Sequence, residues 1–506
     1  MLRCLLCVAA CVSFITVNVV EAEEPVDIGS RREPLVDRAL IDSLDGKAQL
    51  KLHHPQPREI AITFDQAWEG NASGYPTVFQ DGDIYRMYYR GHKYLIDEPP
   101  LRQAQSEAVC YAESDDGIHW TKPNLGIHKW PGVDDDNNII WMGSPEAHNF
   151  APFKDTNPNC PPEQRYKAIG GTVTSKGLWT FQSADGIHWE RLSDGPVVTK
   201  GAFDSHNTAF WDPIHNRYTM YVRFFSEAKF KGLRLIGMCH SKDFANWSEP
   251  VGLEYPGSPP QQMYTNQILP YYRAPHILVG FPTRYVARPL TEHVQQLPPL
   301  ELRKQLIKVY ERCGTDLTDG LFMSSRDGLD FKRWDEAFLR PGPEAEGRWI
   351  YGDNYQSYGL FETKSEHPGL PHEISMHFDE GAWRDKSRRI RRYTIRLDGF
   401  VSLNAPYAGG EMTTKPLTFT GSQLILNYAT SAAGSLKVEL QNADGTPIPG
   451  FTLDESAELF GDSTVQVASW KNGADLSSLA GKPVRLHIEL KDGDLYSFQF
   501  TDGDQP

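Results

Sequence analysis

SDDGIHW (residues 114–120) and SADGIHW (residues 183–189) are almost the same seven residues, written twice in one chain. Two degenerate copies follow, SKDFANW at residues 241–247 and SSRDGLDF at residues 324–331. A heptapeptide that recurs at intervals of several tens of residues indicates a repeated supersecondary unit. The motif therefore predicts that much of the chain is built from one repeating element.

Each copy has the chemistry of a turn between strands. Glycine accepts the positive φ of a tight turn, and aspartate can hydrogen-bond nearby backbone groups. The aromatic residue that ends each copy is large enough to wedge between neighbouring repeats; these residues are Trp120, Trp189, Trp247 and Phe331. We interpret the motif as part of the scaffold rather than as part of a reactive site.

The full repeat is longer than the heptapeptide. Each unit begins with a polar residue and an apolar strand, and a second strand rich in aromatic residues follows, such as DIYRMYYRG at residues 83–91. Five such starts occur, near Ser73, His148, His206, Thr265 and Asp353. All-β repeats of about 50–80 residues are typical of propeller blades. The sequence thus predicts an all-β protein with a five-bladed β-propeller over residues 63–398.

A second domain is expected because 506 residues exceed the size of a single core. Over residues 399–506 the strands alternate more regularly, which predicts a β-sandwich of jelly-roll-like character. Residues 23–62 are expected to form an N-terminal leader segment that packs on the propeller. Residues 291–313 are the one good candidate for a long amphipathic helix, as an insertion.

The first 22 residues have the features of a signal peptide. Arg3 supplies a positive charge, residues 5–20 are mostly apolar, and residues 20–22 form an imperfect cleavage site. A short membrane anchor is the alternative. No later stretch is apolar enough to span a bilayer, so we expect a secreted or periplasmic protein that is not inserted in a membrane after signal cleavage.

The composition argues against two classes of partner. With 66 acidic against 51 basic residues, the formal net charge is −15. Nucleic acids and anionic membranes require a basic face, so neither is expected as a partner. The cysteines outside the leader lack metal-ligand spacing, and they either form one or two disulfides of open pairing or stay as buried thiols; they are Cys110, Cys160, Cys239 and Cys313.

The starts of the propeller repeats are the expected place for a binding site, because the first residues of the innermost strands point at the central channel. Amides, arginines and aromatic rings there suit a carbohydrate, which needs planar hydrogen-bonding partners and stacking faces. The expected stacking faces are Trp68, Tyr75, Trp211 and Tyr355. The expected substrate-binding residues are Arg90, Asn149, Asn207, Arg223, Asn266, Arg284, Asp353 and Asn354.

Three carboxylates are the candidates for catalysis. Cleavage of a glycosidic bond uses one carboxyl group held protonated as the acid and another ionised as nucleophile or base. We expect Glu69 and Asp204 to be channel carboxylates and Glu373 to be the general acid. Asp379 and Glu380 are assigned to a turn. The histidines have no metal-type spacing, so neither a metal nor another cofactor is expected.

At this point the chain resembles the clans that include glycoside hydrolase families 32 and 43, and more closely secreted bacterial proteins described as family 32 N-terminal-like. The stretches that carry the resemblance are REPLVDRALID (32–42), residues 68–91, SDDGIHWTKPNLG (114–126) and RRYTIRLDGFVSLNA (391–405). The resemblance runs from about residue 30 to the C-terminus and implies a five-bladed propeller with a trailing β-sandwich.

The family 32 signatures themselves are absent. WEGNASG (68–74) stands in place of Asn-Asp-Pro-Asn-Gly, HNFAPFKD (148–155) contains no Arg-Asp-Pro, and the third blade has no Glu-Cys pair. The resemblance therefore transfers no family 32 catalytic role to a residue of this chain, and it does not imply fructan cleavage.

Three hypotheses for function remain. The leading one is an exported glycoside hydrolase acting on an oligo- or polysaccharide, and the arginines suggest an acidic or sulfated substrate. The alternative is a non-catalytic carbohydrate-binding propeller, which needs no carboxylate pair. A sialidase is less consistent, because its Asp-containing turn is one residue longer and its tyrosine nucleophile has no evident counterpart.

Overall fold

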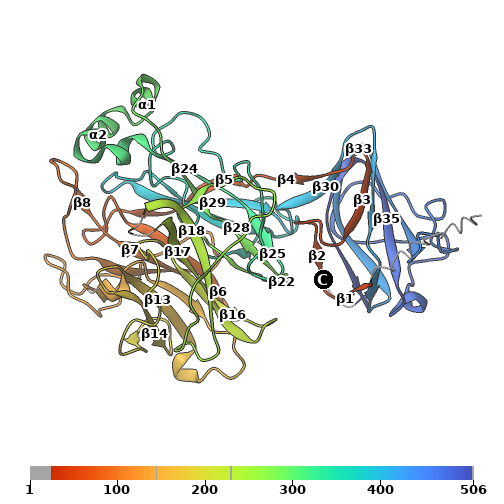
Figure 1. Ribbon diagram of the computed structural model, residues 1–506, viewed down its shortest axis with the longest axis horizontal. Coiled ribbons are helices and arrows are strands. Elements are labelled where there is room, and N and C mark those ends of the chain that lie inside the picture. Colours follow the sequence, from red (N-terminus) through yellow and green to blue (C-terminus); the bar gives the residue numbers. More distant parts are fainter. Residues whose placement is uncertain (1–23, 144, 228, 230, 504–506) are drawn as a thin grey trace, which may run out of the picture.

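The computed structural model describes residues 24–143, 145–227, 229 and 231–503, so the expected signal peptide lies outside the described residues. The chain forms a β-propeller and a β-sandwich, which lie side by side and are joined by β4 (Gln49–Leu52) and β30 (Val401–Ala405) (Figure 1). The predicted all-β class with five blades and a C-terminal sandwich is confirmed.

Five four-stranded antiparallel sheets form the blades. Their strands are β6 (Gly74–Asp81), β7 (Ile84–Gly91), β10 (Ala108–Ser114) and β11 (Ile139–Met142) in blade 1; β12 (Ala151–Lys154), β13 (Tyr166–Thr172), β14 (Gly177–Ser183) and β15 (Glu190–Arg191) in blade 2; β16 (Thr208–Asp212), β17 (Arg217–Glu227), β18 (Lys231–Ser241) and β19 (Val251–Gly252) in blade 3; β21 (Leu269–Tyr271), β22 (Ala274–Gly280), β25 (Met323–Ser325) and β26 (Lys332–Arg333) in blade 4; and β27 (Phe361–Thr363), β28 (Glu373–Glu380), β29 (Arg388–Arg396) and β5 (Gln56–Phe64) in blade 5. Each predicted start lies just before an innermost strand.

Blade 5 is completed by the N-terminal part of the chain. Its outermost strand, β5, pairs antiparallel with β29, so residues 56–64 close a blade whose other strands come some 300 residues later. Buried apolar clusters lie between blades 1 and 2, 2 and 3, 3 and 4, 4 and 5, and 5 and 1. The blades therefore form a closed ring, in which each sheet buries both faces against its neighbours.

The four copies of the heptapeptide fasten blades 1 to 4 each to the preceding blade. Gly186 has a φ of 79°, and its carbonyl oxygen accepts a 2.9 Å hydrogen bond from the hydroxyl of Tyr88 in blade 1. Gly328 of blade 4 accepts the same bond from Tyr221 of blade 3, also at 2.9 Å. In the third copy, Phe244 takes the positive φ and is fully buried against Phe153 of blade 2. The motif is scaffold.

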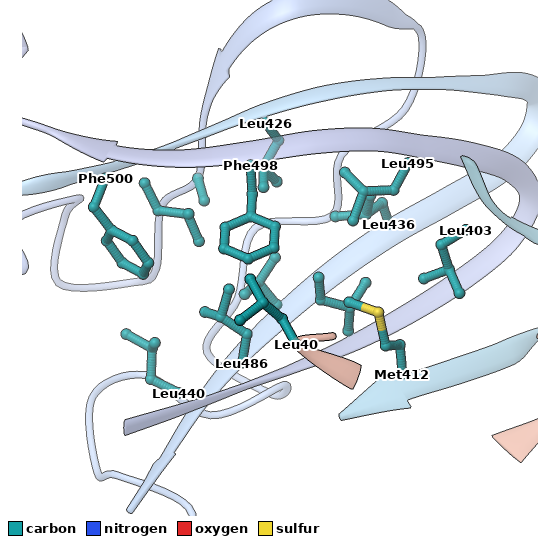
Figure 2. Packing of buried hydrophobic residues seen from close by; sticks show 14 of the residues in the cluster. Leu40, Leu403, Met412, Leu426, Leu436, Leu440, Leu486, Leu495, Phe498 and Phe500 are labelled. Carbon is teal, nitrogen blue, oxygen red and sulfur yellow. The ribbon is translucent and has the colours of Figure 1, made fainter. Parts of the chain in front are cut away.

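The sandwich contains strands from both ends of the described chain. Its ten strands are β1 (Val26–Gly29), β2 (Glu33–Pro34), β3 (Ile41–Gly46), β4, β30, β31 (Gly410–Thr414), β32 (Leu417–Phe419), β33 (Gln423–Asn442), β34 (Asp462–Val467) and β35 (Val484–Thr501). Leucine, methionine and phenylalanine side chains from these strands and from residues next to them fill its core, as Figure 2 shows for Leu40, Met412 and Phe498. The expectation that residues 23–62 form a segment packed on the propeller is thus corrected for β1–β4, which are strands of the sandwich. Within the same range, Val36 and Leu52 do contact the core of blades 4 and 5, and residues 56–62 belong to blade 5 itself.

The sandwich and the propeller share a core. Phe400, just before β30, stacks on Phe322 of blade 4 with ring centroids 5.2 Å apart. Val36 and Leu52 from the N-terminal strands belong to the same buried cluster as the strands of blades 4 and 5. Burial of these aromatic and aliphatic side chains couples the two domains.

A helical insertion interrupts blade 4, as the amphipathic pattern of residues 291–313 predicts. It consists of α1 (Glu292–Gln296) and α2 (Leu300–Thr315), and the two helices lie at one side of the propeller, away from the sandwich (Figure 1). Short strands β20 (Gln262–Met263), β23 (Thr283–Val286) and β24 (Leu317–Gly320) form a small sheet next to it, and β8 (Tyr94–Leu95) pairs with β9 (Arg102–Gln103) nearby. No described helix is long and apolar enough to cross a membrane.

The four described cysteines are free thiols. Cys110, Cys239 and Cys313 are buried and Cys160 is half-buried. Of the two alternatives left open by the sequence, buried thiols and disulfides, the structure shows free thiols over the described residues.

The contact between Gly186 and Tyr88 can be tested by replacing Gly186 with alanine. An added Cβ would lie 2.8 Å from the Tyr88 hydroxyl, and alanine would have to adopt a positive φ. We expect Gly186→Ala to lower the free energy of unfolding by about 1–3 kcal/mol in urea denaturation. Gly195→Ala is the matched control, because nothing lies within 4 Å of its Cβ position. Equal stability of the two variants would contradict the proposed fastening role.

Candidate functional site

A two-lobed pocket brings together residues from all five blades. The arginine lobe is lined by Tyr75, Arg90, Asp204, Tyr264, Arg312, Tyr351, Tyr355 and Arg388, among others. The histidine lobe is lined by His92, Glu107 and His148, among others, and shares Tyr94 and Asp204 with the arginine lobe. Starts of innermost strands and ends of second strands therefore do meet at one site.

Asp204 lies at the junction of the two lobes, in the loop that precedes β16. Its side chain is 60% exposed, so a ligand in the pocket can reach it. Nε2 of His148 lies 3.2 Å from Oδ1 of Asp204, and Nδ1 of the same ring lies 2.8 Å from Oε2 of Glu107. His148, from the start of blade 2, thus bridges an exposed carboxylate and a half-buried one.

The bridge sets the charges of its three members. Burial lowers the pKa of His148, but Glu107 and Asp204 outweigh this effect and raise the pKa to about 9. The walls of the pocket desolvate Asp204 in part and raise its pKa, yet His148 and Arg223 hold the pKa well below its ordinary value. At neutral pH the site therefore contains an imidazolium between two ionised carboxylates.

The arginine lobe has a second set of charges. Arg90, at the end of β7, donates to Oδ1 of Asn149 at 2.7 Å and to the carbonyl of Ala72 at 2.8 Å, and its guanidinium lies 4.8 Å from the centre of the Tyr75 ring. Arg223, at the corresponding place in blade 3, donates to the carbonyl of Ala202 at 2.8 Å. Of these two expected binding residues, Arg90 thus lines the pocket, whereas Arg223 lies behind Tyr264, with its guanidinium 5.0 Å from the centre of that ring.

The tyrosines of the lobe are not activated nucleophiles. Burial, assisted by the neighbouring Tyr264, raises the pKa of Tyr75 and of Tyr351 well above the ordinary value. Both hydroxyls are therefore protonated at neutral pH. Tyr75 and Tyr355 line the pocket, as expected of stacking faces, whereas Trp68 and Trp211 lie elsewhere: Trp68 donates to Asn138 within blade 1, and Trp211 packs on Tyr218.

A buried carboxyl group, that of Asp379, lies behind the Arg388 side chain in the wall of the arginine lobe. Asp379 is in β28, and Nη2 of Arg388, which lines the arginine lobe, lies 3.0 Å from its Oδ1. Burial raises the pKa of Asp379 to about 6 although Arg388 opposes this, and Oδ2 has no hydrogen-bond partner. The assignment of Asp379 and Glu380 to a turn is wrong, because both are buried strand residues.

Asp353 is a second buried carboxyl group with a raised pKa. It accepts hydrogen bonds from the backbone amides of Ala382 at 2.8 Å and Ile350 at 3.2 Å. Burial raises its pKa to about 7 because no cation lies in direct contact. The neighbouring Gly352 lines the arginine lobe, but Asp353 itself is fully buried and shapes the loop rather than contacting a ligand.

Glu373 lies far from the pocket, contrary to the expectation. Glu373 is the first residue of β28. Asp379, which lies near the other end of the same strand, is the residue next to the pocket. Six residues of strand span about 20 Å. The Glu373 carboxylate pairs instead with Arg58 at 3.2 Å. The end of a second strand faces the pocket in blades 1 and 3, and the same rule applied to blade 5 selects Asp379 rather than Glu373.

Glu69, which was expected to be a channel carboxylate, lies inside blade 1 instead. Its side chain is completely buried, and its carboxylate accepts hydrogen bonds from Lys122 at 2.8 Å and from the Tyr89 hydroxyl at 2.6 Å. These bonds fix the loop before blade 1 against the interior of that blade. Glu69 is therefore a structural ion-pair partner and does not line the pocket.

Four other expected binding residues make internal contacts. Asn207 donates to the carbonyls of Phe203 and Ser205, Asn266 to those of His206 and Tyr221, and Asn354 to those of Thr318 and Arg348. Arg284 forms a bidentate pair with Asp319. An amide at the start of a strand is fully used by neighbouring backbone groups, so these side chains hold the blade starts in place. Asn149 supports Arg90 in the same way.

Several pocket residues have no signal in the repeat. Arg312 and Tyr310 come from α2, where Tyr310 breaks the helix with φ −159° and ψ 94°. Glu107, which lines the histidine lobe, and Arg234, which lies behind the Tyr264 ring, belong to a third strand or the loop beside it, which the blade-start rule ignores. His148 is a blade start, but its role depends on Glu107, which is distant in sequence. No group of three or more His, Cys, Asp or Glu residues able to hold a metal ion occurs among the described residues.

Comparison with known proteins gives similarity in structure only. No family model matches the chain, and no curated protein matches it. Similar solved structures include a thermostable family-43 glycoside hydrolase (TM-score 0.39, 12% identity, 68% of this chain and 96% of the other) and the GH32 β-fructofuranosidase of Bombyx mori (TM-score 0.37, 10% identity, 89% and 94%). Another is an N-acetylgalactosamine deacetylase from F. plautii in complex with blood group B trisaccharide (TM-score 0.40, 13% identity, 68% and 94%). With identities this low, function has to be argued from the pocket itself.

The charge on His148 predicts a pH dependence of stability. Its pKa is raised from 6.5 to about 9, so the stabilisation is complete below about pH 6.5 and is lost as pH rises through about 9. Between pH 6.5 and 10 the free energy of unfolding should fall by about 2–3 kcal/mol more in the parent protein than in His148→Gln. His119→Gln, which changes an exposed histidine, should follow the parent protein. Parallel curves for the parent and His148→Gln would refute the imidazolium bridge.

Proposed function

We propose that the protein is a glycoside hydrolase that acts on an oligo- or polysaccharide in the two-lobed pocket. The observation that carries the proposal is Asp204: an exposed, ionised carboxylate beside aromatic rings and hydrogen-bonding groups that can hold a sugar. The expected leader supports export, so the substrate would be met outside the cytoplasm.

In this proposal Asp204 acts as the base or nucleophile. A glycosidase needs two carboxyl groups whose environments push their pKa values apart. His148 keeps Asp204 ionised, while burial keeps Asp379 protonated up to about pH 6. Asp379 is therefore the candidate for the acid, in place of Glu373. Its carboxyl group lies behind Arg388, so the proposal requires the Arg388 side chain to move when substrate binds.

A non-catalytic carbohydrate-binding propeller is the second candidate. It is favoured by one observation: Asp379 is only 1% exposed, so Asp204 is the one carboxylate that lines the arginine lobe among the described residues. A binding protein would use the same rings and arginines and would leave the sugar intact.

Substitution of Asp204 distinguishes the two candidates. On a panel of oligo- and polysaccharides, Asp204→Asn should lower kcat/KM for the hydrolysed member by about 10²–10⁴-fold, because it removes the base while keeping the shape. Glu373→Gln should leave kcat/KM unchanged, because it removes a carboxylate that lies about 20 Å along β28 from Asp379 and the pocket. Hydrolysis that survives Asp204→Asn would end the proposed role. Glycan binding without turnover of any panel member would establish the binding protein instead.

The role of Asp379 predicts the alkaline limb of the activity profile. Since its pKa is about 6 in the free protein, kcat/KM should fall as pH rises through about 6, when the acid loses its proton. Asp379→Asn should abolish this limb together with most of the activity, with the thermal unfolding temperature recorded to verify folding. A profile that keeps the same alkaline limb in Asp379→Asn would assign the acid to another group.

A further inference from the structure

Four guanidinium groups in and behind the wall of the arginine lobe have no carboxylate against them. Arg90 and Arg312 line the lobe, and Arg223 and Arg234 lie behind its Tyr264 ring. Across the described residues, the side-chain hydrogen bonds of all four go to neutral oxygens. Arg234 donates to Oε1 of Gln262 at 2.6 Å, and Arg312 contacts the hydroxyls of Tyr285 at 3.3 Å and Tyr351 at 3.4 Å. Ion pairs compensate arginine elsewhere in this chain, for example Arg284 with Asp319.

Tyrosine rings separate these cations from one another. The guanidinium of Arg234 lies 4.1 Å from the centre of the Tyr285 ring, and that of Arg312 lies 4.7 Å from the centre of the Tyr351 ring. Arg223 lies 5.0 Å from the ring of Tyr264, which Arg234 also approaches, at 5.5 Å. Aromatic faces attract cations without neutralising their charge. The cations are thus held in place and stay available to an anion.

Crowding of like charges is visible in Arg234. Burial lowers the pKa of this guanidinium below its ordinary value, and the positive charges of Arg223 and Arg312 lower it further. An anion placed among them would relieve this repulsion. The nearby carboxylates do not fill that place, because Asp204 is bound by His148 and Asp316 by the hydroxyl of Tyr285.

The helical insertion delivers the outermost of these cations. Within α2, the non-helical backbone of Tyr310 changes the direction of the chain, and Tyr310, Arg312 and Cys313 line the arginine lobe. Tyr310 is 48% exposed at this edge, and the guanidinium of Arg312 lies 5.2 Å from its ring. Arg312 therefore combines an accessible position with neighbours that leave its charge unmatched.

We propose that the arginine lobe binds an anionic substituent, a carboxylate or a sulfate ester, on a sugar ring, with Arg312 and Arg90 as its contacts. Guanidinium groups bind such oxyanions through paired hydrogen bonds. The inference deepens the proposed hydrolase function, because the same lobe contains Asp204. The substrate class is then an acidic or sulfated glycan, and the rings of Tyr75 and Tyr355 provide the stacking faces for its sugar.

The test measures binding rather than turnover, so that it succeeds or fails independently of hydrolysis. Isothermal titration with glucuronate, glucose 6-sulfate and glucose should show that the parent protein binds at least one anionic sugar at least tenfold more tightly than glucose. Glucuronate and glucose 6-sulfate distinguish a carboxylate from a sulfate ester. The preference should weaken as salt concentration rises.

The variants assign the preference to its residues. Arg312→Gln should reduce the affinity for the preferred anionic sugar at least tenfold and leave that for glucose unchanged, whereas Arg312→Lys should retain part of it. Arg102→Gln, which removes an exposed guanidinium beside Asp97, is the matched control and should bind as the parent does. Asp204→Asn should keep the anion preference even where hydrolysis is lost, so failure of the hydrolase proposal would be seen separately.

Two outcomes would overturn the inference. One is a parent protein that binds neither anionic sugar more tightly than glucose. The other is an Arg312→Gln variant that retains the full preference while its unfolding temperature matches that of the parent. If Arg312→Gln is unstable, Arg90→Gln takes its place, with the same expected loss.

Discussion

The pairing of β5 with β29 is the junction on which the rest of the structure depends. A propeller is a ring of sheets that each need a neighbour on both faces, and here the strand that closes the ring comes from the opposite end of the sequence. In the register of these two strands, Arg388 at the start of β29 lies opposite Phe64 at the end of β5. Closure thus places the Arg388 side chain against blade 1, where it donates to the carbonyl of Asn71. The wall of the pocket is a product of closure.

The same junction explains the absence of a side chain at Gly74. This residue has a φ of 150°, and a Cβ there would lie 2.9 Å from Nη2 of Arg388 and 3.0 Å from Oδ1 of Asp379. Blade 1 therefore approaches blade 5 closely enough to keep water away from Asp379. Desolvation is the largest cause of the raised pKa of that carboxyl group, so ring closure and the protonation state of Asp379 are linked.

The repeat pattern was sufficient to predict the ring but not its closure. Five blade starts can be read from the chain because each carries the same strand chemistry, and four of the five units also carry the same turn. The partner of a short strand such as β5 is set by tertiary packing, and nothing local in residues 56–64 specifies β29. For the same reason β1–β4 were expected on the propeller, although their partners are strands of the sandwich.

The site was predicted where the geometry of a blade is regular. Arg90 and Arg223 occupy equivalent positions in the second strands of blades 1 and 3; Arg90 lines the pocket, and Arg223 contacts the ring of Tyr264 in its wall. Glu373 was selected by residue type from the wrong end of β28, and Glu69 by its nearness to a blade start, although burial with Lys122 gives it a structural role. Arg312 could not be foreseen, because its place depends on the break at Tyr310 inside an insertion.

The net charge of −15 does not predict the charge of the arginine lobe. Three arginines and one carboxylate line that lobe, although acidic residues outnumber basic ones in the chain as a whole. A carboxylate in direct contact with Arg223 or Arg312 would neutralise the charge of that guanidinium. The same ion pair would also occupy the carboxylate, which could then not act as a base or nucleophile. Stacking on tyrosine and bonding to neutral oxygens avoid both losses. Asp204 can then be kept ionised by the field of nearby cations while its hydrogen bond goes to His148. One arrangement thus leaves guanidinium groups without a carboxylate partner and an exposed, ionised carboxylate in the same pocket.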